Sequence, residues 1–166
     1  MYRMNKTQQV TGGKDRRRIQ VRTSGVHGKG VFALKKIAAG ERIIEYIGQR
    51  ISWPEALRRH PHDPQQPNHT FYFSLGDGSY VIDAKVGGNA SRWINHACAP
   101  NCEADEDDDS GRVYIQALRN LKPGEELFYD YGLVIDERYT PKLKKDYECR
   151  CGSADCRRTM LAPKRR

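Results

Sequence analysis

The arrangement of the cysteines constrains this chain more than any other feature. Three of its five cysteines lie close to the C-terminus, as Cys149-Arg150-Cys151 and then Cys156, and the other two lie together far upstream, at Cys98 and Cys102. Three thiolates cannot complete the tetrahedral shell of a zinc ion, so a fourth ligand has to come from another part of the chain. Either upstream cysteine can supply it. In both cases the metal would tie the C-terminal segment to the middle of the chain.

Composition indicates a small globular protein of a reducing compartment. The chain has 166 residues, and 37% of them are hydrophobic, which is enough for one domain with one modest core. No apolar run is long enough to span a membrane, and the first residues lack the apolar stretch of a secretory signal. An odd number of cysteines does not fit a closed set of disulfides, so metal ligation is the better interpretation. We therefore expect an intracellular protein with no membrane partner.

The charge is strongly positive and gathers at the two ends of the chain. The formal net charge is +8 and the isoelectric point is about 9.3. Basic residues cluster at positions 14–18 and again from position 157 to the end. Two solvated basic tails explain this pattern, and non-specific DNA contact through them is the alternative. No aromatic residues interleave these charges, so base stacking has little support.

Short β-strands separated by turns dominate the rest of the chain. One helix is predicted from a capping box, with Ser52 as the cap, Pro54 in the first turn and Glu55 three residues after the cap; it should end near Arg59. The acidic run from Asp105 to Asp109 is expected to form a solvated hairpin tip. The predicted strands cover residues 19–23, 30–33, 42–51, 71–75, 80–82, 113–117 and 127–131.

Six short motifs occur in one order along the chain: Gly28-Lys29-Gly30, Glu45 to Gly48, Ile82 to Ala84, Asn95 to Cys102, Gly124 to Tyr131, and the cysteine tail. A glycine pair alone is weak evidence for any function, but the occurrence of all six motifs in this order is specific. The series closely resembles the SET-domain protein-lysine methyltransferases that carry a post-SET zinc module. The resemblance covers the chain from about residue 19 to residue 161.

The resemblance implies a mainly β fold, the SET-domain β-clip. In this fold small curved sheets surround a pseudoknot, in which the segment Asn95-His96 is threaded beside Tyr129-Asp130-Tyr131. One short helix and a zinc-bound C-terminal tail complete the expected structure. The expected division of the chain is a flexible basic arm at 1–17, a SET domain at 18–132, a linker at 133–146 and a post-SET zinc module at 147–163.

The activity implied is the transfer of methyl groups from S-adenosylmethionine (SAM) to the side-chain amine of a lysine. Such a displacement needs alignment, an apolar channel and a neutral amine. A free lysine has a pKa near ~10.4, and a desolvated aromatic channel lowers it. By matching positions, the resemblance assigns catalysis to Tyr131, helped by Tyr46 and Tyr129, and the lysine channel to Tyr46, Phe71, Tyr129 and Tyr131. The hydroxyl of Tyr129 favours mono- or dimethyl-lysine as product.

The resemblance also assigns the cofactor and metal residues. SAM would be bound by Lys29, Gly30, Asn95, His96, Tyr131, Met160 and Leu161. Structural Zn²⁺ would be held by Cys98, Cys149, Cys151 and Cys156, with Cys102 as a small buried residue or spare thiol. Nearby arginines at 150, 157 and 158 would compensate part of the thiolate charge. Asn95 as an ordinary turn residue, and His96 as a structural histidine or a zinc ligand, are the other interpretations.

The implied substrate is a lysine-containing protein, most simply a histone or histone-like protein, with other small basic proteins left open. A different class of function is a catalytically silent, zinc-stabilised SET module that binds nucleic acid or basic protein tails. Intact Tyr131, Asn95 and the glycine pair favour the enzyme, whereas Trp93, Ala97 and Phe71 depart from the usual pattern. The expected location is the nucleus or chromatin in a eukaryote, and the cytoplasm, nucleoid or a host cell for a bacterial protein.

Overall fold

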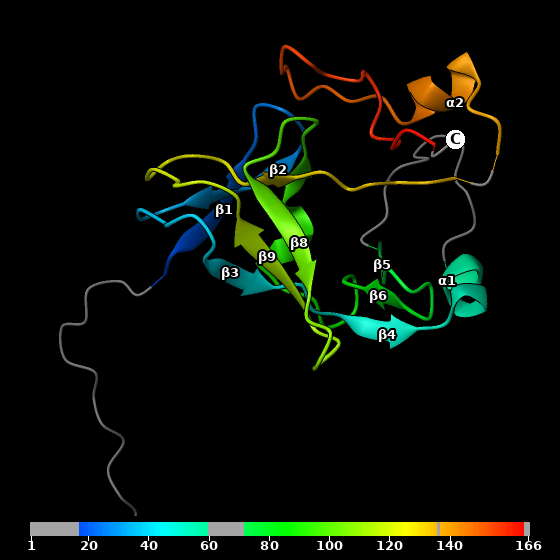
Figure 1. Ribbon diagram of the computed structural model, residues 1–166, viewed down its shortest axis with the longest axis horizontal. Coiled ribbons are helices and arrows are strands. Elements are labelled where there is room, and N and C mark those ends of the chain that lie inside the picture. The colour runs from blue at the N-terminus through cyan, green and yellow to red at the C-terminus, as the bar shows by residue number, and fades with distance from the viewer. Residues whose placement is uncertain (1–16, 60–71, 136, 165–166) are drawn as a thin grey trace, which may run out of the picture.

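The structure, a computed structural model, describes residues 17–59, 72–135 and 137–164 (Figure 1). Short strands dominate, as the sequence predicts. In chain order the elements are β1 (Ile19–Thr23), β2 (Lys29–Ala33), β3 (Arg42–Glu45), β4 (Gln49–Ile51), α1 (Trp53–Arg59), β5 (Tyr72–Ser74), β6 (Val81–Asp83), the 3-10 helix η1 (Ala90–Trp93), β7 (Asn95–His96), β8 (Cys102–Glu106), β9 (Val113–Ala117), β10 (Phe128–Tyr129) and α2 (Pro141–Asp146).

Within these residues the strands form four small sheets rather than one continuous layer. Two sheets have three strands, in the orders β3-β9-β8 and β4-β6-β5, and two are pairs, β1-β2 and β10-β7. All of the pairings are antiparallel except that of β7 with β10. Figure 1 shows the β3-β9-β8 sheet in the middle of the molecule, with the β4-β6-β5 sheet and α1 to one side. The mainly β fold class is therefore confirmed.

The core lies where these sheets face one another. Its fully buried side chains come from β2, β9 and the loops beside them, and they include Val31, Ile115, Leu121 and Leu127. Cys102 belongs to the same cluster and is 0% exposed. Burial of each large aliphatic side chain stabilises the fold by roughly 1.5–3 kcal/mol, so this cluster holds the body of the protein together.

The single strand expected over residues 42–51 is wrong in one respect, because it is divided into β3 and β4. The chain turns at Gly48, where a Cβ would collide with the carbonyl oxygen of Asp83. That close approach lets β4 leave the first sheet and pair with β6 instead, with Gln49 opposite Asp83. A run of strand-forming residues in the sequence cannot reveal that its two halves pair with different strands.

The acidic run begins inside a strand that the sequence did not predict. β8 extends to Glu106, and the hairpin turn that follows contains Asp107, whose side chain accepts hydrogen bonds from the backbone N–H groups of Asp109 and Ser110. Arg42 on β3 forms ion pairs with Asp105 at 2.9 Å and Asp107 at 3.1 Å. These contacts offset the repulsion between acids and allow a strand in an acidic sequence.

The segment expected to be only a linker contains the second short helix, α2. Thr140 caps it by accepting a hydrogen bond from Leu143 N at 3.1 Å, and Pro141 occupies the first turn. No residue of α2 is buried. Neither α-helix among the described residues has the length and apolar character needed to cross a bilayer.

Candidate functional site

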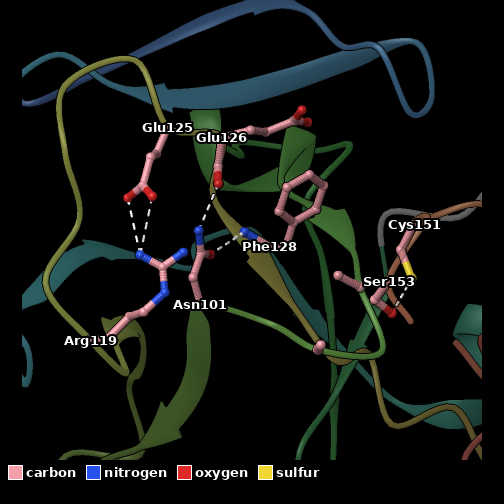
Figure 2. A pocket seen from close by; sticks show the side chains of 9 residues that line it. Asn101, Arg119, Glu125, Glu126, Phe128, Cys151 and Ser153 are labelled. Atoms are coloured by element: carbon pink, nitrogen blue, oxygen red, sulfur yellow. Dashed lines mark hydrogen bonds and ion pairs between the residues drawn. The ribbon is translucent and has the colours of Figure 1, made fainter. Parts of the chain in front are cut away.

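The site is built around the parallel pair of β7 with β10. Asn95 lies opposite Phe128, and His96 lies opposite Tyr129, so segments more than thirty residues apart in the chain are adjacent. Asn101 clamps the pair: its Nδ2 donates to Glu126 O at 2.8 Å, and its Oδ1 accepts from Phe128 N at 2.8 Å (Figure 2). This is the threading that the resemblance implies.

The Asn95 amide joins the glycine pair to this strand pair. Its Nδ2 donates to Lys29 O at 2.9 Å, to His27 O at 3.1 Å and to Glu126 Oε1 at 3.0 Å. The two amide hydrogens are shared among these three acceptors, and no donor is bonded to the amide oxygen Oδ1 among the described residues. Lys29 and Asn95 therefore lie together, as predicted, with an open acceptor between them.

Glu126 is a site residue that the sequence reasoning missed. Its carboxylate accepts from Asn95 and also from Ser24 Oγ at 3.0 Å. A Cβ at Gly30 would overlap this carboxylate, so any larger residue there would displace the Glu126 side chain. The signal was present, because Glu126 stands inside the motif Gly124 to Tyr131, but the motif does not say where its side chain points.

The three predicted tyrosines cluster on the side of the strand pair that faces the core. The rings of Tyr129 and Tyr131 lie 4.9 Å apart, and the Tyr131 hydroxyl donates to Ile94 O at 2.6 Å. Tyr46 packs against Phe73, with ring centroids 5.3 Å apart. Phe71, which was assigned to the lysine channel, lies outside the described residues, and Phe73 is the aromatic side chain beside Tyr46.

The environment of these hydroxyls disfavours charge. Burial raises the pKa of Tyr46, of Tyr129 and of Tyr131 well above the usual value; the Asp83 carboxylate adds to the effect at Tyr46, and neighbouring tyrosine hydroxyls add to it at Tyr129 and Tyr131. A cationic side chain that entered the same surroundings would lose hydration, and its pKa would fall. The cluster therefore suits a neutral amine.

His96 is a buried neutral side chain. Burial lowers its pKa to about 4, against the opposing effect of the Asp130 carboxylate. Its Nδ1 accepts from Tyr131 N at 3.1 Å, so the proton of the neutral ring is on Nε2, which lies 3.5 Å from Cys98 Sγ. The ring thus lies between the tyrosine strand and the cysteines, outside the four-thiol group described next.

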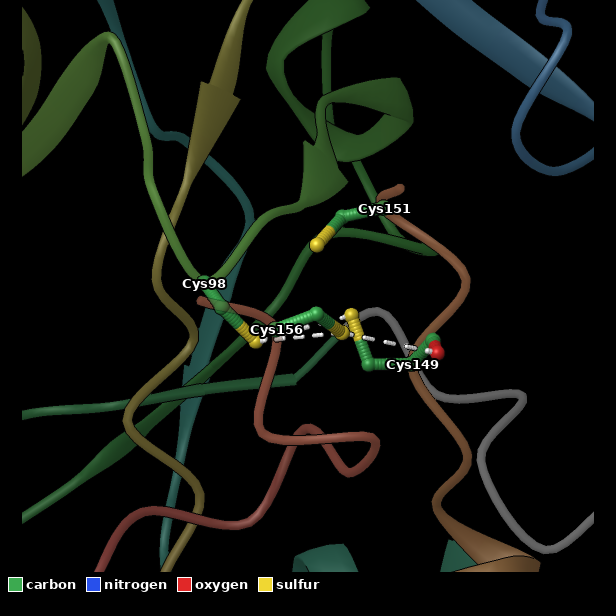
Figure 3. A group of neighbouring side chains, drawn as sticks. All are labelled: Cys98, Cys149, Cys151 and Cys156. Carbon is green, nitrogen blue, oxygen red and sulfur yellow. Dashed lines mark hydrogen bonds between the residues drawn. The ribbon is translucent and has the colours of Figure 1, made fainter. Parts of the chain in front are cut away.

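Cys98 joins the three C-terminal cysteines in one group (Figure 3), whose sulfur atoms all lie within 4.8 Å of one another. Its Sγ is 3.7 Å from that of Cys149 and 3.9 Å from that of Cys156. A tetrahedral Zn²⁺ with Zn–S bonds of ~2.3 Å separates its sulfurs by about 3.8 Å, so the group is compatible with structural zinc. Cys102 lies apart in the core, and burial raises its pKa to about 12.

Two arginines proposed to balance the thiolates have other partners. Arg150 pairs with Glu148 at 3.0 Å, and Arg157 pairs with Asp130 at 2.8 Å. The sulfurs instead receive backbone donors: Arg157 N donates to Cys98 Sγ at 3.4 Å, and Arg158 N donates to Cys156 Sγ at 3.3 Å. Such N–H···S contacts orient metal ligands and stabilise their charge.

The predicted cofactor residues of the tail lie just beyond the cysteine group. Leu161 is 1% exposed and bridges to Leu133, while Met160 N donates to Tyr147 O at 2.7 Å. These contacts fold the tail over the segment that follows Tyr131. Among the described residues no hydrogen bond joins either residue to Asn95.

Two cavities adjoin the strand pair. The first, of about 310 Å³, lies between Glu126 and Phe128 on one side and Cys151 and Ser153 of the tail on the other (Figure 2). The second, of about 380 Å³, is lined by Phe73 and Tyr131, among others. Successive side chains of a strand point to opposite faces, so Phe128 and Tyr129 lie on different sides of β10. The arrangement offers separate spaces, one next to Glu126 and Phe128 and one next to Tyr131.

Comparison with known proteins agrees with this geometry. The SET domain family model matches residues 28–132. The chain is 37% identical over 139 residues to the histone-lysine N-methyltransferase trithorax of Drosophila virilis, covering 82% of this chain and 3% of that protein. It is 36% identical over 146 residues to the H3 lysine-4 specific histone-lysine N-methyltransferase of Saccharomyces cerevisiae, covering 87% and 13%.

A solved structure of ctPRC2, in an autoinhibited conformation bound to S-adenosylmethionine, matches with a TM-score of 0.63 and 34% identity, over 70% of this chain and 15% of that one. The chain thus spans only a small part of the relatives it matches. The match to the SET model, and the identity to the trithorax and yeast proteins over most of this chain, carry the assignment. The chain belongs to the SET domain family.

Proposed function

We propose that this protein transfers methyl groups from SAM to the side-chain amine of lysine in a histone or histone-like protein. The observation that carries the proposal is the parallel pairing of β7 with β10, which places Asn95 and the glycine pair beside Tyr129 and Tyr131. The relatives are named histone-lysine N-methyltransferases, and the ctPRC2 structure holds SAM. Both facts support the same reaction.

The residues near Asn95 fit the donor. The open Oδ1 of Asn95 can accept a hydrogen bond from the ammonium group of SAM, and the missing Cβ of Gly30 leaves room for the Glu126 carboxylate that holds the Asn95 amide. When bound, SAM supplies a methyl group activated by a positive sulfur. We assign its binding to Lys29, Gly30, Asn95, His96, Tyr131, Met160 and Leu161.

The tyrosines would hold the acceptor. We assign the lysine channel to Tyr46, Phe71, Tyr129 and Tyr131, and catalysis to Tyr131 with help from Tyr46 and Tyr129. Their buried surroundings would keep the amine neutral, and the Tyr131 hydroxyl, fixed by Ile94 O, would orient it. No covalent nucleophile is needed, because the amine itself attacks.

Zinc would be held by Cys98, Cys149, Cys151 and Cys156 as a closed, structural site. Four thiolates fill the tetrahedron and leave no position for a water or a substrate. The metal would then fold the tail against the strand pair, where Cys151 and Ser153 close one side of the first cavity.

The hydroxyl of Tyr129 is the basis for a mono- or dimethyl product. Its ring lies 4.9 Å from that of Tyr131 and its side chain is buried, so the hydroxyl takes up space beside the amine. Replacing it in Tyr129→Phe should increase the share of trimethyl-lysine in mass spectra of the product. An unchanged distribution would remove this part of the proposal.

The test of the reaction is incubation of the protein with labelled SAM and a panel of core histones and other lysine-rich proteins. Label on lysine that is lost in Tyr131→Phe supports the proposal. Calorimetric SAM uptake without any label would instead indicate the silent binding module, and absence of both label and uptake would refute the enzyme.

The location and the nucleic-acid contact complete the proposal. A histone substrate places the protein on chromatin in a eukaryotic cell, and a histone-like one places it on a bacterial nucleoid. We include non-specific DNA contact through the basic ends, whose affinity should fall steeply between low and high salt in a mobility-shift assay. Equal binding after neutralising both ends would contradict it.

A further inference from the structure

One ion pair joins the cysteine group to the tyrosine strand. Arg157 directly follows Cys156, and Asp130 lies between Tyr129 and Tyr131. The guanidinium binds the carboxylate with both of its terminal nitrogens, Nη1 to Oδ2 at 2.8 Å and Nη2 to Oδ1 at 3.0 Å. Such a two-point contact fixes direction as well as distance, which a single-point pair does not.

Both ends of this pair are anchored by further contacts. The backbone N–H of Arg157 donates to Cys98 Sγ at 3.4 Å, so the residue is attached to the thiol group through its main chain. Asp130 Oδ1 accepts from Gly132 N at 3.0 Å, which fixes the turn just after Tyr131. The pair is also partly shielded, with side-chain exposures of 24% for Arg157 and 35% for Asp130.

A second connection runs beside the first. His96 accepts from Tyr131 N at Nδ1 and places Nε2 next to Cys98 Sγ. Cys98 therefore touches the tyrosine strand by two routes, one through the Arg157 side chain and one through the His96 ring. Together they define the position of Tyr131 relative to the thiols.

The partner of Arg157 argues against simple charge compensation. An arginine that served only to balance four thiolates would need no carboxylate, and Asp130 offsets part of the positive charge that Arg157 presents to the thiols. The geometry is that of a connection between two segments. The thiols receive their donors from backbone N–H groups instead.

We propose that Arg157 and Asp130 are positioning residues, and that their ion pair, the Arg157–Asp130 latch, sets the direction of the Tyr131 side chain against the metal-bound tail. The inference rests on the proposed function, because it gives Tyr131 the central role. Displacing a reacting group by ~1 Å can cost about a hundredfold in rate. The latch should therefore act on turnover more than on substrate affinity.

The experiment is a double-mutant cycle with Arg157→Ala, Asp130→Asn and the two combined. Each single change should lower kcat about tenfold with KM for the protein substrate within about threefold, and the double change should be no worse than either single one. Zinc content should stay at the wild-type value in all three. Hydrogen exchange of the Tyr131 amide should become faster, because the neighbouring Asp130 is no longer fixed and the Tyr131 N–H bond to His96 Nδ1 opens more often.

Lys142→Ala is the matched control, since it breaks an exposed pair with Asp146 in α2, in the same C-terminal segment. It should change neither turnover nor amide exchange. Additive losses in the double variant, or unchanged Tyr131 exchange with zinc retained, would overturn the latch. Loss of zinc from both single variants would also overturn it, because the pair would then serve metal retention.

Two of these measurements test the latch independently of the proposed methyl transfer. Amide exchange and zinc content require neither SAM nor substrate. An inactive wild-type protein would refute the proposed function, and the positional effect of the latch would still be decided by exchange at Tyr131 in the same variants.

Discussion

The body of the molecule and its C-terminal segment are held together by different forces. The body has a cluster of aliphatic side chains that are 0% exposed, among them Val31, Ile115 and Leu121. In residues 137–164 the buried side chains are only Cys149, Thr159 and Leu161. Apolar burial of that size cannot offset the entropy of ordering nearly thirty residues, so the segment depends on thiol ligands and ion pairs.

The largest effect is expected for Cys98→Ser, which removes one of the four thiol ligands and so tests the contrast between the body and the C-terminal segment. Apparent zinc-binding free energies of about 10–16 kcal/mol are known for four-ligand sites, so loss of the ion should release the whole tail. We expect loss of zinc by elemental analysis, fast hydrogen exchange over residues 147–162, and activity below detection. The body should keep its exchange protection.

Cys102→Ala is the control for this experiment, because Cys102 is buried in the core and not in the thiol group. It should keep the metal and lose only about 1 kcal/mol of stability through the small cavity. If Cys98→Ser unfolds the body as well, the two regions are not independent and the contrast is wrong.

The next largest effect is expected for Tyr131→Phe, a change within the body of the molecule. The hydroxyl that donates to Ile94 O is lost while the ring and its packing stay. We expect kcat to fall about a hundredfold from loss of orientation, with zinc content and folding unchanged. Tyr80→Phe, at a ring that is 50% exposed, is the comparison and should be silent in the same assay.

The sequence predicted the motifs better than it predicted their surroundings. Asn95, His96 and the tyrosines are adjacent as the resemblance implies, because matching motifs carry a whole topology with them. Counting thiols left Cys98 and Cys102 equal as ligands. The structure distinguishes the two cysteines through β8, because Cys102, the first residue of this strand, faces the core. The sequence did not predict β8, since its acidic residues are not typical of a strand.

Side-chain direction was the information that the sequence lacked at the site. Glu126 and Asn101 were inside recognised motifs, yet their contacts with Asn95 and Phe128 depend on how two distant segments pack. The same holds for Arg157, which proximity in sequence assigned to the thiols and the fold assigns to Asp130. Long-range pairing decides such partners, and local patterns do not record it.

A smaller effect is expected from Gly30→Ala, where the added methyl would overlap the Glu126 carboxylate. Overpacking of this kind costs about 1–3 kcal/mol, because Glu126 has to move and the Asn95 amide loses an acceptor. Denaturant unfolding should show the loss, and calorimetry should show weaker SAM uptake. Gly25→Ala, with no atom within 4 Å of the added Cβ, should change neither.

The smallest effect concerns alkaline pH. Burial raises the pKa of Tyr46, so the unfolded chain loses this proton near pH ~10 while the folded protein keeps it. The stability is therefore fully present below about pH 10 and is lost as the pH rises above it. Between pH 9 and 11, the free energy of unfolding of Tyr46→Phe should fall less than that of the wild type, and the two losses should differ by at most about 1.4 kcal/mol. Denaturant titrations at the two pH values measure both losses, and equal losses would contradict the prediction.

The threading of β7 beside β10 has a consequence for how the protein is made. Asn95 emerges from the ribosome well before Phe128, and the two have to meet across the intervening β8–β9 hairpin. Contacts between segments so distant along the chain carry a loop-closure cost and form slowly. Tyr131 and three of the four clustered thiols, those of Cys149, Cys151 and Cys156, come later still, so a nascent or prematurely terminated polypeptide could complete its aliphatic interior and remain inert. Competence would arrive only after the three cysteines at positions 149, 151 and 156 have been translated.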